Sequence, residues 1–388
     1  MSVKQFNHVK ISGISTVVPQ KEINIYDEVQ YYENSVKKID RMRKMVGFHK
    51  RRVVDKTTTA ADLAYDAALN LIENMKIDKN EIDALIFVVQ QPDYRTPSTA
   101  YFIHSKLGLS KECLATDINQ GCVGWIYGLY MVSQMIESGA HKKVLLLSAD
   151  TPSADIDIAD RNSAPLFGDA GSATLLEYTQ EENLTYYNLE IKSDGYEALI
   201  TPFSANRFRI DYTKQEDIDL LIKLSQEKVT LPSGNEMPLL NPYMDGMAVF
   251  NFTINEVPKN IKAIMNYTKL ETNDIPVLCL HQANKQIVQA IAQSVGFELE
   301  KAPYTAFENY GNNTMCSIPT TLALLEKETS KKNLLCCGFG NGLVCASVIL
   351  NLENTFIDKI RDFKKPSYVL TRDEYINYWK NKMQGKEE

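Results

Sequence analysis

A long apolar segment in the first half of the chain runs directly into a strand-like run. Residues 121–149 read GCVGWIYGLYMVSQMIESGAHKKVLLLSA. A helix over about 122–138, ending at Gly139, would be apolar on most sides, and such a helix lies inside a protein. The continuous apolar pattern of 143–149 is typical of a parallel strand that is buried on both faces. This segment predicts an interior helix–strand unit of an α/β fold.

An internal repeat indicates that the chain is duplicated. KIDKNEID (76–83) matches KLETNDIP (269–276), and KKVLLL (142–147) matches KKNLLC (331–336) at nearly the same offset. Chance could produce two such matches, but two similar α/β halves explain both of them.

The repeat divides the chain into three parts. We expect an N-terminal half with residues 1–178, a C-terminal half with residues 179–352 and a tail with residues 353–388. Residues 195–247 have no counterpart in the first half and are interpreted as an insertion. Because the tail contains six aromatic residues, we expect it to pack a helix on the body instead of remaining solvated.

The composition excludes several classes of protein. Of the 388 residues, 44% are hydrophobic and 23% are charged, as in ordinary globular proteins. The net charge of −7 and the lack of a basic run argue against nucleic-acid and membrane partners. Neither a secretory signal nor an apolar run of about 20 residues is found. We therefore expect a cytoplasmic protein.

One of the seven cysteines stands out. The set lacks CxxC spacing, so no zinc site is expected, and most of its members are interpreted as buried and reduced. Cys122, however, lies between Gly121 and Gly124 at the start of the interior helix. The helix dipole would lower its pKa there, and the glycines would let a substrate approach. This segment alone supports a nucleophile and a structural cysteine equally.

Two further segments offer polar partners. His281 follows an apolar run in VLCLHQANKQIV (277–288), and Asn312 and Asn313 lie in ENYGNNTMCSIP (308–319). Taken singly, His281 would be a histidine whose hydrogen bonds are satisfied within the protein. Either asparagine would cap a helix or form a turn. Taken with the cysteine, they suit acyl-thioester chemistry. The thiol would hold an acyl group, and neutral imidazole and carboxamide N–H groups would stabilise an oxyanion or enolate.

These motifs resemble the β-ketoacyl-ACP synthase III group of the thiolase superfamily over about residues 8–352. DINQGCVGW is similar to its nucleophile segment, HQAN (281–284) to its histidine motif and YGNNTMCSIP to its YGNTSAASIP-type segment. In that last segment the family's catalytic asparagine falls on Asn312. FGDAGSATLLE (167–177) and GFGNGLVCASVIL (338–350) resemble two further glycine-rich segments of the group.

The resemblance implies a thiolase-like five-layer αβαβα fold built from two duplicated halves, usually in a homodimer. It also implies that Cys122 takes an acyl group from acyl-CoA or an acyl carrier protein. A malonyl thioester then loses CO₂, and His281 and Asn312 stabilise the enolate that attacks the acyl-cysteine. No metal and no redox cofactor are implied. The family's GGG-type loop becomes Gly340, Asn341 and Gly342, whose backbone N–H groups would help to form the oxyanion hole.

The resemblance also assigns three substrate contacts. Arg161 matches a CoA-contacting arginine, and Asn284 ends the HQAN motif. Thr96 stands where an aromatic side chain often shapes the partner subunit's acyl pocket, so a smaller residue there permits a longer or branched acyl chain. Arg41 and Met45 replace the Trp and Arg that hold the CoA adenine in the family's priming enzymes.

The residues that would dock a carrier protein also depart from the family pattern. The helix after HQAN carries glutamine and serine where basic residues are expected. An alternative basic face could come from Lys44, Lys50, Arg51 and Arg52. These departures favour a specialised acyl, lipid or secondary-metabolite pathway over the initiation of fatty acid biosynthesis.

Three functions therefore compete. The first is a decarboxylative condensing enzyme, which the three motifs together favour. The second is an acyltransferase on the same fold that passes the Cys122 acyl group to an alcohol or an amine. The third is a non-catalytic partner subunit. Gln90 and Gln91 replace the glutamate of the enzymes that make hydroxymethylglutaryl thioesters, which makes that chemistry a poor fit.

Overall fold

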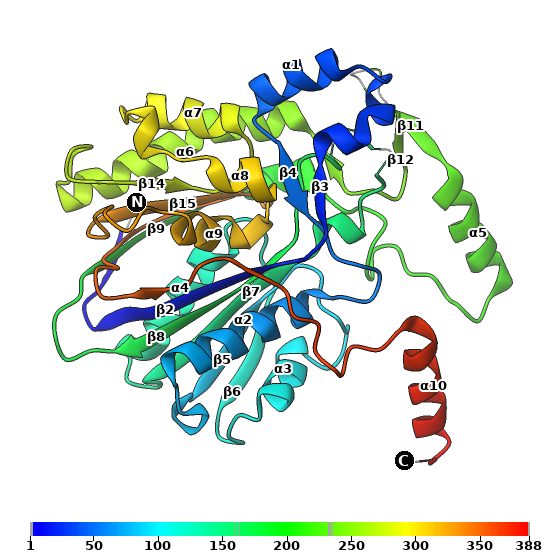
Figure 1. The fold of residues 1–388 in the computed structure, drawn as a ribbon, viewed down its shortest axis with the longest axis horizontal. Coiled ribbons are helices and arrows are strands. Elements are labelled where there is room, and N and C mark those ends of the chain that lie inside the picture. The colour runs from blue at the N-terminus through cyan, green and yellow to red at the C-terminus, as the bar shows by residue number, and fades with distance from the viewer. Residues whose placement is uncertain (1–2, 159, 162, 232–233, 235, 387–388) are drawn as a thin grey trace.

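The computed structural model describes residues 3–386 except 159, 162, 232, 233 and 235. It has two mixed β-sheets that sandwich a central helix layer, with further helices on both outer faces (Figure 1). The five-layer αβαβα prediction is therefore confirmed. The layer order follows from hydrophobicity, because the central helices are apolar all round while the outer helices have one apolar stripe.

The N-terminal sheet has the order β17-β2-β8-β7-β5-β6, and β18 also pairs with β2. Its strands are β2 (Val9–Val18), β5 (Ala84–Val88), β6 (Leu114–Ile118), β7 (Lys143–Asp150), β8 (Ala170–Tyr178), β17 (Phe356–Ile357) and β18 (Arg361–Asp362). The C-terminal sheet has the order β1-β9-β16-β15-β14. Its strands are β1 (Lys4–Phe6), β9 (Thr185–Ile191), β14 (Leu278–Leu280), β15 (Leu334–Gly340) and β16 (Val344–Leu350).

The duplication predicted from the repeat is visible in strand pairing. In the N-terminal sheet, β2–β8 and β8–β7 are antiparallel and β7–β5 is parallel. In the C-terminal sheet, β9–β16 and β16–β15 are antiparallel and β15–β14 is parallel. The repeated sequences immediately precede β5 and β14, or overlap β7 and β15. The same supersecondary unit therefore occurs twice.

Helix α4 (Gly124–Glu137) is the interior helix that the sequence predicts, and it joins the two sheets. Trp125 and Ser133 lie within it and are almost fully buried. The Trp125 indole donates to Thr174 in β8 at 3.0 Å, and the Ser133 hydroxyl bonds Tyr187 in β9 at 2.9 Å. These hydrogen bonds satisfy the Trp125 N–H and the Ser133 hydroxyl, which would otherwise be buried without partners between the halves. The central layer also holds α9 (Ser317–Ala323).

The outer layers consist of amphipathic helices. On the N-terminal sheet they are α2 (Ala60–Met75) and α3 (Thr99–Leu107), and on the C-terminal sheet α6 (Gly246–Thr268) and α7 (Lys285–Ser294). Beside α7 lie β3 (Glu22–Asn24), η1 (Ile25–Tyr32), α1 (Val36–Val46), β4 (Lys50–Arg52) and α8 (Thr305–Tyr310). Short 3-10 turns are η2 (Lys79–Glu81), η3 (Pro152–Ala154), η4 (Ser193–Ala198), η5 (Leu299–Lys301) and η6 (Thr314–Cys316).

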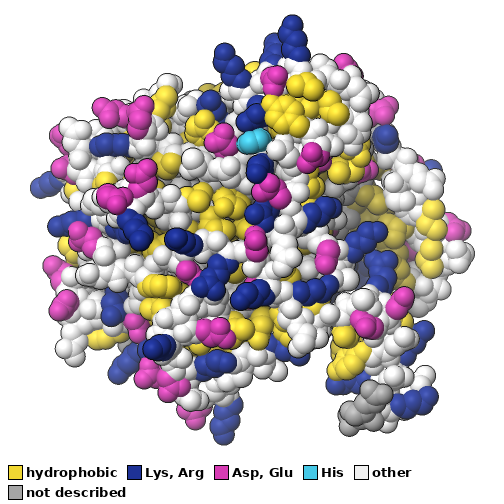
Figure 2. Space-filling view, in the orientation of Figure 1, with side chains coloured by type: hydrophobic (Ala, Val, Ile, Leu, Met, Phe, Trp, Pro, Cys, Tyr) yellow, Lys and Arg dark blue, Asp and Glu magenta, His cyan; other side chains and the backbone are white. Residues whose placement is uncertain are grey.

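The predicted insertion projects from one side of the body (Figure 1). It contains β10 (Leu199–Ile200), α5 (Gln215–Gln226), β11 (Lys228–Thr230), β12 (Glu236–Pro238) and β13 (Tyr243–Met244). Figure 2 shows cationic and anionic side chains interspersed over most of this face of the molecule. Within the described residues, no helix is both long enough and apolar enough to span a membrane.

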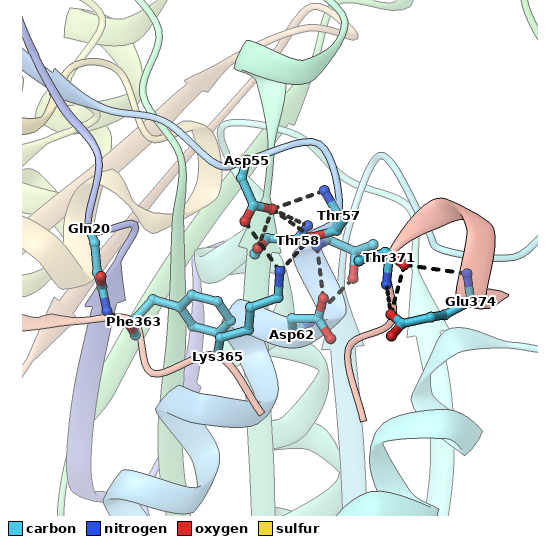
Figure 3. A network of polar contacts seen from close by, with 10 residues as sticks. Gln20, Asp55, Thr57, Thr58, Asp62, Phe363, Lys365, Thr371 and Glu374 are labelled. Carbon is cyan, nitrogen blue, oxygen red and sulfur yellow. Dashed lines mark hydrogen bonds and ion pairs between the residues drawn. The ribbon is translucent and has the colours of Figure 1, made fainter. Parts of the chain in front are cut away.

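The tail is anchored by its extended part. Strands β17 and β18 pair with β2, and Phe363 is buried against the N-terminal sheet. The Lys365 ammonium donates to the Thr57 hydroxyl at 2.6 Å and to the Asp55 carboxylate at 3.3 Å (Figure 3). Tyr368 then packs edge-on against two aromatic rings of the body.

The expectation that the tail packs a helix on the body is wrong. Helix α10 (Arg372–Met383) begins with a capping box in which Thr371 and Glu374 exchange hydrogen bonds (Figure 3). Every side chain along it is exposed or half-buried, and the helix stands away from the body. Beyond Tyr368, a side-chain hydrogen bond between Tyr375 and Tyr94 joins the helix to the body. No residue of the helix is buried, so capping and local propensity form it without a packed face.

The close packing of α2 on β8 gives a test of the fold. A Cβ atom on Gly171 would lie 2.5 Å from the Leu63 backbone, so Gly171→Ala must displace α2. We expect a loss of about 1–3 kcal/mol in the free energy of unfolding, measured by urea denaturation. At Gly246, where α6 begins, no described atom lies within 4 Å of such a Cβ. Gly246→Ala should therefore leave the stability unchanged or slightly higher, and equal losses in both variants would contradict this packing.

Candidate active site

Cys122 lies where the two halves meet. It precedes α4 in the N-terminal half, and Gly340 at the end of β15 comes from the C-terminal half. A Cβ atom on Gly340 would lie 2.9 Å from the Cys122 Cβ and 3.1 Å from its Sγ. Only glycine allows so close an approach, so the β15 backbone forms one wall beside the sulfur.

The Cys122 thiol is protonated in the resting protein. Burial raises its pKa to about 12, the Asp150 carboxylate adds to this, and a backbone hydrogen bond opposes it. The net direction is opposite to the lowering expected from the helix dipole, because Cys122 is only 9% exposed and burial disfavours the thiolate. The Cys122 sulfur must therefore lose its proton as its bond to the acyl carbon forms.

His281 follows β14 and is fixed by both its backbone and its ring. Its N–H donates to the Cys337 carbonyl at 2.8 Å, and the ring packs edge-on against Phe339 at 5.3 Å between centroids. Burial lowers the pKa of His281 to about 3, which a backbone hydrogen bond with Thr314 only partly offsets. The imidazole is therefore neutral at physiological pH. Its Nδ1 has no hydrogen-bond partner among the described residues.

Asn312 is held by its backbone and oriented by its side-chain oxygen. Its N–H donates to the Leu166 carbonyl at 2.7 Å, and its carbonyl accepts from the Gly168 N–H at 3.2 Å. The Oδ1 atom accepts the Thr314 N–H at 2.9 Å. This bond fixes which end of the amide is the acceptor, so the NH₂ group is left to donate to a ligand.

The neighbouring Asn313 has a different task. Its NH₂ group donates to the Tyr310 carbonyl at 3.2 Å, which closes the turn before η6. The segment by itself leaves both asparagines as candidates, whereas the family resemblance points to Asn312. These contacts also favour Asn312, whose amide donor is available.

The three predicted residues are linked through neighbours. Phe339 packs on the His281 ring, and the next residue along β15, Gly340, abuts Cys122. Thr314 contacts both the imidazole and the asparagine side chain. All three residues are buried.

The glycine-rich loop places a polar side chain beside this region. Gly340, Asn341 and Gly342 connect β15 to β16. A Cβ on Gly121 would lie 2.2 Å from the Asn341 Oδ1 and 2.7 Å from the Gln90 Oε1, so both amides lie over the residue that precedes the cysteine. The Asn341 Oδ1 is buried with no hydrogen-bond partner among the described residues.

Arg161 braces a neighbouring segment. Its guanidinium donates to the Glu28 carboxylate at 2.9 Å and to the Tyr32 hydroxyl at 2.7 Å, and it stacks over the Tyr32 ring. Glu28 also pairs with the buried Arg51. A CoA contact by Arg161 remains a prediction, and these contacts already use much of its donor capacity to hold η1.

The other two predicted substrate contacts are Thr96 and Asn284. Thr96 is exposed in the loop before α3. The Asn284 side chain caps α7 by accepting the Ile287 N–H at 2.9 Å. Neither position is tested as a substrate contact, although the cap gives Asn284 a structural role that the motif alone did not reveal.

The predicted alternative basic face is mostly wrong. Arg51 and Arg52 are turned inward to Glu28 and Asp362, and Lys50 pairs with Glu22 at 2.8 Å. Pairing with carboxylates neutralises these three cations, although the Lys50 side chain stays 33% exposed, and a sequence pattern cannot show such pairs. Lys44 is exposed.

Two buried polar residues were missed by reasoning from sequence. The Gln282 NH₂ group donates to the Leu280 and Pro303 carbonyls, and its Oε1 accepts the Phe307 N–H. It thereby ties the histidine segment to α8. Asp150 is the other, at the end of β7. A polar residue closing an apolar strand is the signal that could have found it.

Family models and relatives agree with this geometry. The model described as 3-oxoacyl-(acyl-carrier-protein) synthase III matches residues 116–195, and the model of its C-terminal part matches residues 265–352. A Campylobacter jejuni protein named 3-oxoacyl-(acyl-carrier-protein) synthase 3 is 36% identical over 93% of this chain and 99% of its own length. The chain belongs to this family.

Other relatives extend the comparison. A β-ketoacyl-(acyl-carrier-protein) synthase III from Staphylococcus epidermidis is 30% identical and aligns over 88% of this chain and 97% of its own length. A solved 3-oxoacyl-(acyl-carrier-protein) synthase from Burkholderia xenovorans superposes with a TM-score of 0.82 at 31% identity, covering 93% of this chain and 99% of that one. The family is one of condensing transferases that act on acyl thioesters, and this chain is such an enzyme.

The burial of Asp150 predicts a pH-dependent stability. Burial, then the neighbouring Asp169, raises its pKa to about 7 from 3.8. Because the folded state holds this proton more tightly than the unfolded chain, stability falls as the pH rises from about 4 to 7. We expect Asp150→Asn to raise the melting temperature at pH 8 by about 2 °C or more, and the gain should vanish near pH 4.

The matched control is Asp373→Asn, which changes an exposed carboxylate on α10. The melting temperature of this variant should equal that of the wild type at every pH. A pH-independent effect of Asp150→Asn, or a loss of stability at pH 8, would contradict the burial assigned to this carboxyl group.

Proposed function

We propose that Cys122 carries the acyl group and that His281 and Asn312 stabilise the enolate of a malonyl thioester. The observation that supports this most strongly is that the buried thiol abuts Gly340 of the other half, next to the residue that packs on the neutral imidazole. Neutral donors stabilise developing negative charge without requiring a buried cation, and their effect is larger where water is excluded.

In the first half-reaction, the Cys122 sulfur attacks the carbonyl carbon of an acyl-CoA or an acyl carrier thioester. The new C–S bond to Cys122 forms, the C–S bond to the donor breaks, and the thiol proton leaves with the released donor thiol. The backbone N–H groups of Cys122 and of the loop with Gly340, Asn341 and Gly342 would bind the oxyanion. Splitting the reaction at a thioester separates one difficult transfer into two easier ones.

In the second half-reaction, a malonyl thioester occupies the same region. Its carboxylate leaves as CO₂, and the electron pair of the broken C–C bond passes into the thioester enolate. The enolate oxygen accepts hydrogen bonds from the His281 N–H and the Asn312 NH₂. The enolate carbon then attacks the acyl-cysteine, the C–S bond breaks, and the Cys122 sulfur regains a proton. We propose that these residues complete the cycle without a metal or redox cofactor.

We also propose that the working unit is a homodimer. No described strand pairs with the outer edge of β6, and Leu114 on that strand is 45% exposed. An open apolar strand edge favours pairing with another chain. Thr96 is exposed in a nearby loop, as required of a residue that would line the partner's acyl pocket. The departures at Arg41 and Met45 support a specialised acyl or lipid pathway.

Replacing the three residues should separate the half-reactions. Cys122→Ala should abolish the mass gain that intact-protein mass spectrometry detects after incubation with a panel of acyl-CoAs. His281→Ala and Asn312→Ala should still acquire the acyl group but lose at least about 100-fold in condensation with malonyl-CoA, since each removes a donor to the enolate. Release of β-ketoacyl thioester measures the second step.

Cys113→Ala is the matched control, because Cys113 is also buried but lies away from the junction. It should acquire the acyl group and condense normally. Acylation that persists in Cys122→Ala would overturn the assignment of the nucleophile. Transfer of the Cys122 acyl group to an alcohol or an amine, with no malonyl decarboxylation, would favour the acyltransferase alternative. Failure to acquire any acyl group from CoA or carrier donors would favour a non-catalytic subunit.

A further inference from the structure

Helix α1 is strongly basic in an acidic chain. Its sequence, VKKIDRMRKMV, has five cations and one carboxylate, a net charge of +4, whereas the whole chain has −7. In Figure 2, dark-blue side chains project at the top of the molecule, where Figure 1 places α1.

Three of the five cations are not neutralised. Lys38 pairs with Glu33 at 2.9 Å, and Arg43 donates to the Tyr26 hydroxyl at 2.8 Å and stacks on its ring. The remaining three are exposed and form no ion pair with any described residue; they are Lys37, Arg41 and Lys44, here named the α1 cation row.

The geometry of the α1 cation row suits binding of another protein. Its members are spaced i, i+4 and i+7, so they lie on one face of the helix and extend over about 10 Å. The opposite face is fixed, since Ile39 is fully buried with Tyr32 and Phe48. Beneath η1, which leads into α1, Glu28 is buried between two arginines. The cations are therefore presented by an anchored helix.

The row lies beside the active-site segment. Gly47 ends α1, and a Cβ atom on it would lie 2.5 Å from the Lys285 Cβ. Lys285 begins α7, only four residues after His281. A partner seated on α1 would thus be close to the segment that carries the catalytic imidazole. Helix α7 has Lys285 as its single charged residue, so it offers no comparable row of cations.

We propose that the α1 cation row is the docking site for an acyl carrier protein that delivers a thioester to Cys122. An acidic carrier helix fits three cations in line, because opposite charges spaced along two helices steer encounter and fix the register. Val36 and Met45, 54% and 47% exposed at the two ends of α1, add apolar contacts that suit a protein surface better than a free nucleotide. This proposal rests on the proposed function and names the partner of the same site.

The test reverses two members of the row in the full chain. The variant is Lys37→Glu and Lys44→Glu together, with Arg41 kept because its position matches a CoA contact of the family, and the probes are a bacterial malonyl-acyl carrier protein and malonyl-CoA. Replacing attraction by repulsion at two positions should raise the KM for malonyl-carrier at least about 10-fold, while kcat and the KM for malonyl-CoA stay within about two-fold. In the wild type, the KM for malonyl-carrier should rise with salt, and this dependence should flatten in the variant.

The matched control reverses two exposed lysines elsewhere that also form no ion pair with described residues: Lys111 and Lys327. It has the same change in net charge and should keep the wild-type KM for malonyl-carrier. An equal loss in this control, or an equal loss with malonyl-CoA in the α1 variant, would overturn the proposal.

Direct binding separates this proposal from the proposed function. Anisotropy of a fluorescently labelled holo-acyl carrier protein measures docking without turnover. Binding by the wild type that the α1 reversal weakens at least about 10-fold supports the docking site even if condensation fails. No binding by the wild type, with normal turnover of CoA thioesters, overturns the docking site and leaves the proposed function intact.

Discussion

The close contact between Gly340 and Cys122 is the constraint on which the rest of the structure depends. It joins the end of β15 in the C-terminal half to the residue that introduces α4 in the N-terminal half. A side chain at Gly340 would push the halves apart and move Phe339, which positions the His281 ring. Helix α4 supports the same junction from within, with hydrogen bonds to a strand of each sheet. The duplicated fold thus produces a site that neither half contains alone.

Burial sets the electrostatic state of that site. The same desolvation that raises the pKa of Cys122 to about 12 lowers the pKa of His281 to about 3. Both side chains are therefore neutral at physiological pH, and Asn312 is neutral by nature. A site with no resident charge does not attract counter-ions that would compete with an enolate, and its N–H donors become most effective when charge develops on the substrate. The carboxyl of Asp150, with a pKa raised to about 7, is also largely neutral below that pH.

Much of the fold and the core of the site could be predicted from the sequence because their signals are local. An apolar helix with a glycine at its end, buried strands and two recurring segments predict the layers and the duplication. Glycines around Cys122 and the HQAN and YGNN segments indicate the three candidate residues, all of which the structure buries. The predictions that failed concern the basic face and the tail helix, which depend on contacts between distant residues. Arg51 and Arg52 have acidic partners that no local pattern reveals, and α10 forms from its own cap although none of its residues is buried.

The most direct test of the central claim is a crystal structure of the protein with a non-decarboxylating malonyl-thioester analogue bound. We predict that the thioester carbonyl oxygen of the analogue lies about 2.7–3.2 Å from both an imidazole nitrogen of His281 and the Nδ2 of Asn312. Its reactive carbon should face the Cys122 Sγ. An analogue that binds with this oxygen directed to other groups, or with Cys122 on the far side of the His281 ring, would contradict the account.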